Sequence, residues 1–152
     1  MVSIIHRIGI KSRSSQVYKA LSTINGLAHW WTEEVEGDEQ VGGKIKFTFR
    51  TETGEVKGQM VMEVKELHPE TNVRWVCTEG PAEWIGTDIS FDLSQQDGQT
   101  IIIFGHRNWQ EEVEFKAHCS MKWAVFLLSL REYVETGKGK PSPHDLKIDN
   151  WN

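Results

Sequence analysis

Much of the chain alternates apolar and polar positions with the period of a β-strand. Residues 4–10 carry isoleucine or histidine at every second position, and residues 44–50 place Ile45, Phe47 and Phe49 between polar side chains. Further strands are predicted at residues 56–68, 73–78, 85–93 and 100–108, separated by turn residues. Apolar positions on one side and polar positions on the other indicate an antiparallel sheet with one face exposed to water.

Two short helices are predicted directly after the first strand. Residues 17–24 space apolar side chains at i, i+3, i+4 and i+7, and Ser14 or Ser15 is placed to cap this helix. A second helical stripe covers residues 27–31. The acidic stretch 33–39 follows and is typical of a strand edge or a loop that faces water.

The last predicted element is a long helix from about Val113 to Thr136, which Gly137 is placed to end. Its middle, residues 123–130, is apolar nearly all round, so other elements must cover it on most sides. The remaining residues, 138–152, are rich in glycine, proline and lysine. This composition predicts an irregular and mobile C-terminal tail.

The order of elements is therefore strand, two helices, six strands and one long helix. Because the strands are grouped apart from the helices, we expect an α+β fold, in which a curved antiparallel sheet of about seven strands wraps around the C-terminal helix. The 152 residues correspond to one domain, which we assign to residues 1–137, followed by the tail at 138–152.

Charge and composition exclude several classes of function. With 22 Asp and Glu against 17 Lys and Arg, the formal net charge is −5, which argues against nucleic acid as a partner. No apolar run is long enough to span a bilayer, and the first residues lack the apolar core of a signal peptide. We therefore expect a cytoplasmic protein with no membrane span. Cys77 and Cys119 lack the CxxC spacing, so we expect buried thiols without a chemical role.

Aromatic residues give the first indication of a binding site. The chain has seven tryptophans against two tyrosines. Six of them are spread over elements that should converge on the interior, namely Trp30, Trp31, Trp75, Trp84, Trp109 and Trp123. Such rings can fill a solid core or provide a cavity with rigid apolar walls. Met60 and Met62 share the predicted inner face with Phe47 and Phe49, where they can form either ordinary core or an adaptable binding surface.

Candidate catalytic chemistry is sparse. His118 lies four residues after Glu114 without the second histidine of an HExxH site, so we expect no metal. The sequence also lacks a GxSxG turn and a glycine-rich phosphate loop, and we expect no cofactor. In the register that turns Ile102 and Phe104 inward, His106 also faces the interior as a neutral ring, suited to anchoring a ligand. No carboxylate is evident nearby to assist catalysis, so we assign no catalytic residue.

Three segments together carry a family resemblance. They are ALSTINGLAHWWT at residues 20–32, the strand pair WIGTDISFDL and TIIIFGHRNW at 84–93 and 100–109, and CSMKWAVFLLSLREYVETGKG at 119–139. The chain resembles the SRPBCC or START-like superfamily with the Bet v 1-like helix-grip fold, and within it the activator of Hsp90 ATPase homolog 1-like branch. The three segments consist of packing and turn residues, so they identify the fold better than the activity.

The resemblance implies a ligand chamber. In this superfamily the long helix and the curved sheet enclose an apolar cavity that is open at one end, and various members bind lipids, sterols or polyketides there. The eukaryotic Hsp90 activator has a separate N-terminal domain that supplies much of the stimulation, whereas this chain begins at the first predicted strand. The resemblance therefore favours a small apolar ligand, such as a lipid, a polyketide or an aromatic compound, over a chaperone partner.

Three functional hypotheses follow. The first is binding of a small, largely apolar ligand in an internal cavity between the C-terminal helix and the sheet. The second is a cyclase-, hydratase- or lyase-like enzyme that uses the same cavity, with His106 assisting proton transfer. The third is an Hsp90-activator-like interaction domain that uses its outer surface. The predicted ligand-binding residues are Trp31, Phe47, Phe49, Met60, Met62, Trp75, His106, Trp123 and Leu127.

Overall fold

The computed structural model describes residues 1–152 and contains one sheet and three helices. The strands are β1 (Val2–Ile10), β2 (Glu34–Gly37), β3 (Lys44–Arg50), β4 (Val56–His68), β5 (Asn72–Glu79), β6 (Asp88–Gln96) and β7 (Gln99–Trp109). The helices are α1 (Ser14–Ser22), α2 (Ile24–Trp30) and α3 (Glu114–Thr136). These elements confirm the predicted α+β helix-grip architecture, with two short helices after strand one and a long C-terminal helix. None of the three helices combines the length and the apolarity that a membrane crossing requires.

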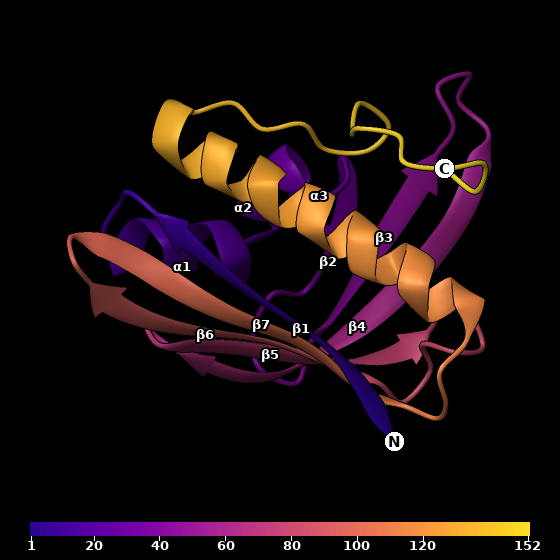
Figure 1. Ribbon diagram of the computed structural model, residues 1–152, viewed down its shortest axis with the longest axis horizontal. Helices are drawn as coiled ribbons and strands as arrows, with labels where there is room; N and C mark the ends of the chain where they lie inside the picture. Colours follow the sequence, from indigo (N-terminus) through magenta and orange to yellow (C-terminus); the bar gives the residue numbers. More distant parts are fainter.

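The seven strands form one antiparallel sheet in the order β1-β7-β6-β5-β4-β3-β2. Strands β2 to β6 each pair with the next strand along the chain, and β1 forms the far edge by pairing with β7. Figure 1 shows α3 lying across the sheet, with α1 and α2 beside one end of it. The helix and the inner face of the sheet therefore face each other along most of the molecule.

The inner face follows the predicted register. Ile102, Phe104 and His106 on β7 are each completely buried, which confirms that this period-two set points inward. The β6–β7 hairpin fixes that register through a two-residue turn at Asp97 and Gly98, both of which have positive φ angles of 51° and 77°. Aspartate followed by glycine is a preferred pair for this type of turn.

Helix α3 has the predicted position and a glycine at its end. Gly137 adopts a left-handed conformation with φ of 89°, and its N–H donates to the carbonyl of Tyr133 at 2.8 Å. The predicted cap of α1 is wrong, because Arg13 occupies the N-cap position and no side chain caps the helix. The hydroxyl of Ser14 instead accepts a hydrogen bond from Gln95 on β6, a contact that local sequence does not reveal.

The C-terminal tail, residues 138–152, folds back along α3 toward β3 and β4 (Figure 1). The backbone N–H of Ser142 donates to the carbonyl of Trp31 at 2.8 Å, and its own carbonyl accepts from the N–H of Glu33 at 3.2 Å. Farther back along the tail, the N–H of Lys140 donates to Ser129 Oγ at 2.8 Å. The sequence did not predict these contacts. Two of them join the tail to segments more than 100 residues away, and the third joins it to the side of α3.

Candidate functional site

A pocket of about 200 Å³ lies between the first half of α3, strands β3 and β4, the β5–β6 connection and the tail. Its lining joins deeply buried aromatic rings to solvent-exposed side chains such as Lys57 and Trp151, so the space reaches from the surface into the core. The lining residues are Trp31, Phe49, Lys57, Gly58, Met60, Pro81, Trp84, Phe115, His118, Cys119, Lys122, Trp123, Phe126, Ser142, Asp145, Trp151 and Asn152.

Aromatic rings form a continuous wall on the inner side of the pocket. Trp31 lies 5.0 Å from Trp123 and 5.4 Å from Phe49, measured between ring centroids. Trp84 stacks on Trp123 at 6.0 Å, and Phe126 contacts Phe49 at 6.4 Å. All five rings are at most 7% exposed, so the wall is rigid and almost entirely removed from water.

The strand register explains why open space remains beside this wall. Phe49 on β3 pairs directly with Gly58 on β4, and Phe47 pairs with Met60, so these positions share one face of the sheet. Gly58 has no side chain, and a Cβ placed there would meet no atom within 4 Å. The missing side chain therefore leaves part of the pocket free.

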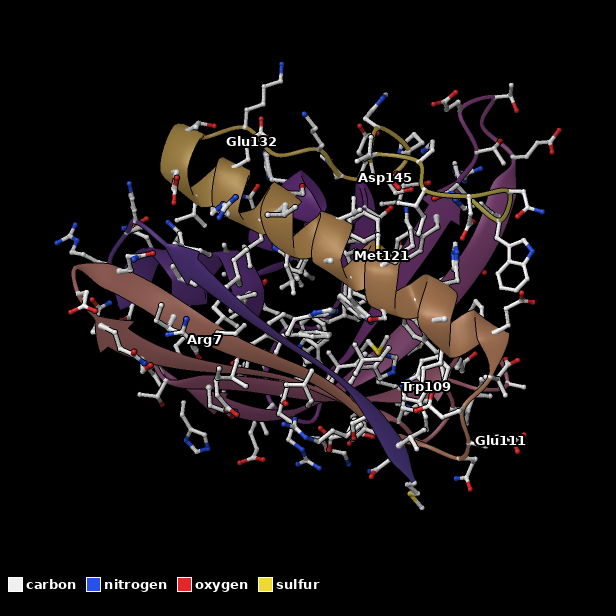
Figure 2. All side chains as sticks on the ribbon, in the orientation of Figure 1. Arg7, Trp109, Glu111, Met121, Glu132 and Asp145 are labelled. Carbon is white, nitrogen blue, oxygen red and sulfur yellow. The ribbon has the colours of Figure 1, made fainter.

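The tail forms the roof of the pocket through a buried ion pair. Lys122 on α3 binds the carboxylate of Asp145, the carbonyl of Leu146 at 3.1 Å and Asn152 Oδ1 at 2.8 Å. The other oxygen of Asp145 accepts from Lys147 at 3.2 Å. Burial by itself would raise the pKa of Asp145, but hydrogen bonds and charges from Lys122 and Lys147 outweigh it and lower the pKa. Figure 2 shows Asp145 on the tail beside α3.

A second group of contacts fastens the end of the tail over the start of α3. His118 Nδ1 lies 2.7 Å from Asp149 Oδ2, and the hydrogen bond from this histidine lowers the pKa of the Asp149 carboxyl. The indole of Trp151 packs on the ring of His118 at 5.4 Å and near Phe115 at 6.4 Å. Access to the pocket from this side therefore depends on how firmly residues 145–152 are held.

Two buried polar atoms of the lining lack a good hydrogen-bond partner. The hydroxyl of Ser142 has none, and Trp84 Nε1 has no acceptor other than the sulfur of Cys119, which accepts only weakly. Buried donors are normally satisfied, because an unpaired one costs about 1–3 kcal/mol. Neither atom is therefore committed to a strong hydrogen bond within the protein.

His106 stands behind the pocket wall, where both of its ring nitrogens are bound within the protein. Nδ1 accepts from Trp123 Nε1 at 3.0 Å, and Nε2 lies 2.8 Å from the hydroxyl of Thr87, which donates to the carbonyl of Trp84 at 2.6 Å. An indole can only donate, so Nε2 carries the proton of the neutral ring. Burial lowers the pKa of His106 to about 3, and the ring stays uncharged at neutral pH.

The structure brings together some of the predicted binding residues and separates others from the pocket. Four of them line it, namely Trp31, Phe49, Met60 and Trp123. Five others lie in the buried core outside the lining, namely Phe47, Met62, Trp75, His106 and Leu127. For these five, direct contact with a ligand stays a prediction.

Sequence reasoning missed the polar half of the site. Lys57 and Lys122 carry no local signal, because each resembles an ordinary surface lysine in the sequence. Ser142, Asp145 and Trp151 reach the pocket only because the tail turns back over α3. Trp84 belonged to the noted set of tryptophans, although its place in the wall depends on the β5–β6 connection.

The two cysteine thiols of the chain, of which only Cys119 lines the pocket, are poorly activated. Burial raises the pKa of Cys119 to about 12 and that of Cys77 to about 11, so both remain thiols rather than nucleophilic thiolates. No group of three or more His, Cys, Asp or Glu side chains is arranged to hold a metal ion. The arrangement is suited to enclosing an apolar molecule and offering it a few hydrogen-bond donors.

Comparison with known proteins connects this geometry to a family. Residues 11–135 match the family described as activator of Hsp90 ATPase homolog 1-like protein. The solution structure of an Aha1 dimer from Colwellia psychrerythraea is 44% identical, with a TM-score of 0.78, and the alignment covers 91% of this chain and 100% of that one. No match was found among curated proteins.

More distant structures share the fold alone. CalU16 from Micromonospora echinospora is 20% identical over 93% of this chain and 77% of its own, with a TM-score of 0.69. DynU16, a putative protein in the dynemicin biosynthetic locus, is 15% identical over 90% of this chain and 48% of its own, with a TM-score of 0.73. At these identities the comparison concerns architecture and carries no site residue across.

Proposed function

The chain belongs to the activator of Hsp90 ATPase homolog 1-like family, and within it we propose a binding protein that holds a small, largely apolar molecule in the pocket under the C-terminal tail. The observation that carries this proposal is the aromatic wall of Trp31, Phe49, Trp84 and Trp123 facing open space. A concave apolar site with a few convergent polar groups is the usual form of a small-molecule site. We place the protein in the cytoplasm, where Cys77 and Cys119 remain free thiols.

The size of the pocket limits the ligand. An apolar protein cavity of about 150 Å³ is large enough for benzene. At about 200 Å³, this pocket favours a compound of one ring with a short substituent over a sterol.

The predicted binding residues enter the proposal in two roles. Trp31, Phe49, Met60 and Trp123 contact the ligand directly, since they line the pocket. His106 acts as a positioning residue, because its Nδ1 holds the indole of Trp123 at 3.0 Å. Catalysis is not part of the proposal, since both nitrogens of His106 are engaged and its ring has little basicity at neutral pH.

Native mass spectrometry of freshly purified protein tests the proposal. We expect a retained small molecule on the wild-type chain and none on Gly58→Phe, whose new ring would occupy the open space opposite Phe49. Gln59→Phe is the matched control, because Gln59 is the next residue on β4 and lies outside the lining. An empty wild-type protein that also fails to bind single-ring aromatic compounds would refute the proposal.

Self-association is a second candidate, supported by the outer face of α3. Met121 and Leu128 lie seven residues apart on this face and are 56% and 49% exposed (Figure 2 labels Met121). The relative from Colwellia psychrerythraea is a dimer. We expect Met121→Glu combined with Leu128→Glu to shift the mass measured by light scattering from dimer to monomer. Contact with a chaperone, the third hypothesis from the sequence, stays a prediction.

A further inference from the structure

Lys57 is an unpaired charge at the pocket. This lysine lies at the start of β4, one residue before Gly58, and its ammonium group has neither a hydrogen bond nor an ion pair within the protein. Burial and the positive charges of Lys122 and Lys147 lower the pKa of Lys57, and only Asp145 acts in the opposite direction. An additional negative charge at this position would therefore be favourable.

The acidic group at the pocket cannot serve Lys57. One oxygen of Asp145 binds Lys122, and the other binds Lys147 at 3.2 Å. Asp145 is the single acidic side chain of the lining, whereas Lys57 and Lys122 both belong to it. The side chains of the lining thus carry more positive than negative charge, although the whole chain has a formal net charge of −5.

The unused hydrogen-bonding capacity of the lining consists mainly of donors. Lys57 offers three N–H groups, Trp84 offers its indole N–H, and Ser142 offers a hydroxyl. The three N–H groups of Lys122 already donate to Asp145, Leu146 and Asn152. A complementary ligand would supply acceptor oxygens and a negative charge, and a carboxylate has both properties.

We propose that the ligand of this pocket is an aromatic or similarly compact carboxylic acid, whose anionic group pairs with Lys57 while its apolar body lies against the aromatic wall. This inference rests on the proposed binding function and specifies its ligand class. The ring would lie near Trp31 and Phe49, and the carboxylate would point toward the mouth beside the tail.

Isothermal titration calorimetry with two matched probes tests this inference. 3-Phenylpropionate and 3-phenylpropan-1-ol share the same ring and chain length and differ in charge. We expect the acid to bind roughly tenfold more tightly at low salt, with an advantage that shrinks as sodium chloride is added. Lys57→Gln should remove this advantage, whereas Lys46→Gln, which changes the net charge equally outside the lining, should keep it.

Charge reversal provides the strongest arm of the experiment. Lys57→Glu should reject 3-phenylpropionate and instead prefer 3-phenylpropylamine over the alcohol. If acid and alcohol bind equally to wild type, or if Lys57→Gln leaves the preference intact, the inference is wrong while the binding function stands. If the wild-type protein binds neither probe and carries no molecule in native mass spectrometry, both the inference and the binding function are overturned.

Discussion

The indole Nε1–H of Trp123 donates to Nδ1 of His106 at 3.0 Å, although one residue lies on α3 and the other on β7. The bond fixes the proton of the neutral imidazole on Nε2, which faces the hydroxyl of Thr87 at 2.8 Å. Thr87 in turn donates to the carbonyl of Trp84. This chain of hydrogen bonds connects two tryptophans of the pocket wall through residues that are all at most 5% exposed.

Breaking this chain at Thr87 should destabilise the protein. Thr87→Val keeps the shape of the side chain but leaves His106 Nε2–H without an acceptor, while the Trp84 carbonyl keeps only the backbone N–H of Thr87 as a donor, at 2.9 Å. We expect a loss of about 1–3 kcal/mol in the free energy of unfolding, measured with urea. The control is Thr71→Val, where the hydroxyl is exposed and the change should stay within about 0.5 kcal/mol. Equal stability of the two variants would contradict the role given to this chain.

Acidification should destabilise the protein through His106. An unfolded histidine takes up a proton below about pH 6.5, whereas burial keeps the folded residue neutral until about pH 3. Between these values the unfolded state binds more protons, so stability falls as the pH decreases, by up to about 1.4 kcal/mol per pH unit. Urea unfolding of wild type and His106→Gln from pH 7 to pH 4.5 should show a shallower dependence in the variant. Identical slopes would mean that His106 is protonated in the folded protein.

Filling the pocket should change stability little, whereas enlarging a core side chain should lower it. Gly58→Phe places a ring in open space and should change the free energy of unfolding by less than about 1 kcal/mol. Met62→Trp enlarges a side chain that is completely buried outside the pocket lining, and overpacking should cost about 1–3 kcal/mol. Thermal and urea unfolding of both variants check this contrast. If Met62→Trp does not lower the free energy of unfolding, the core behind the pocket wall must contain open space.

The buried carboxylate of Asp145 should hold the tail in place. Asp145→Asn removes the charge that Lys122 and Lys147 share. We expect the free energy that holds the tail on α3 to fall by about 1–3 kcal/mol. Hydrogen exchange should accelerate in residues 138–152 and leave the central strands unchanged. Glu132→Gln is the control, since it alters an exposed pair with Lys140 at 3.9 Å (Figure 2 labels Glu132 and Asp145). Equal exchange in both variants would show that the tail is held by other contacts.

Cys119 offers an independent measure of tail opening. Its thiol lines the pocket and is 4% exposed, and burial raises its pKa to about 12. In a Cys77→Ala background, N-ethylmaleimide should label Cys119 slowly when the tail has the wild-type sequence. The labelling should be several-fold faster when the tail carries Asp145→Asn. Mass spectrometry follows the labelling. An unchanged rate would show that access to the pocket does not depend on the position of the tail.

Local pattern determined most of the fold. The period-two stretch ending at Trp109 and the helical stripe ending at Gly137 depend on backbone geometry over a few residues, so the sequence predicts them closely. The inward direction of His106 followed from the same periodicity, because Ile102 and Phe104 must be buried together with it. The predicted cap at Ser14 failed where a residue from a distant strand, Gln95, competes for the hydroxyl.

The candidate site depends on contacts that no local pattern encodes. The sequence by itself determined an aromatic interior. Of the nine binding residues predicted from it, Trp31, Phe49, Met60 and Trp123 line the pocket. Only the tertiary structure decided that Gly58 leaves space opposite Phe49, that Asp145 returns to meet Lys122, and that His106 is fully bonded behind the wall. The physical reason is that a pocket consists of the volume left between elements, which depends on their three-dimensional packing rather than on the preferences of any single segment.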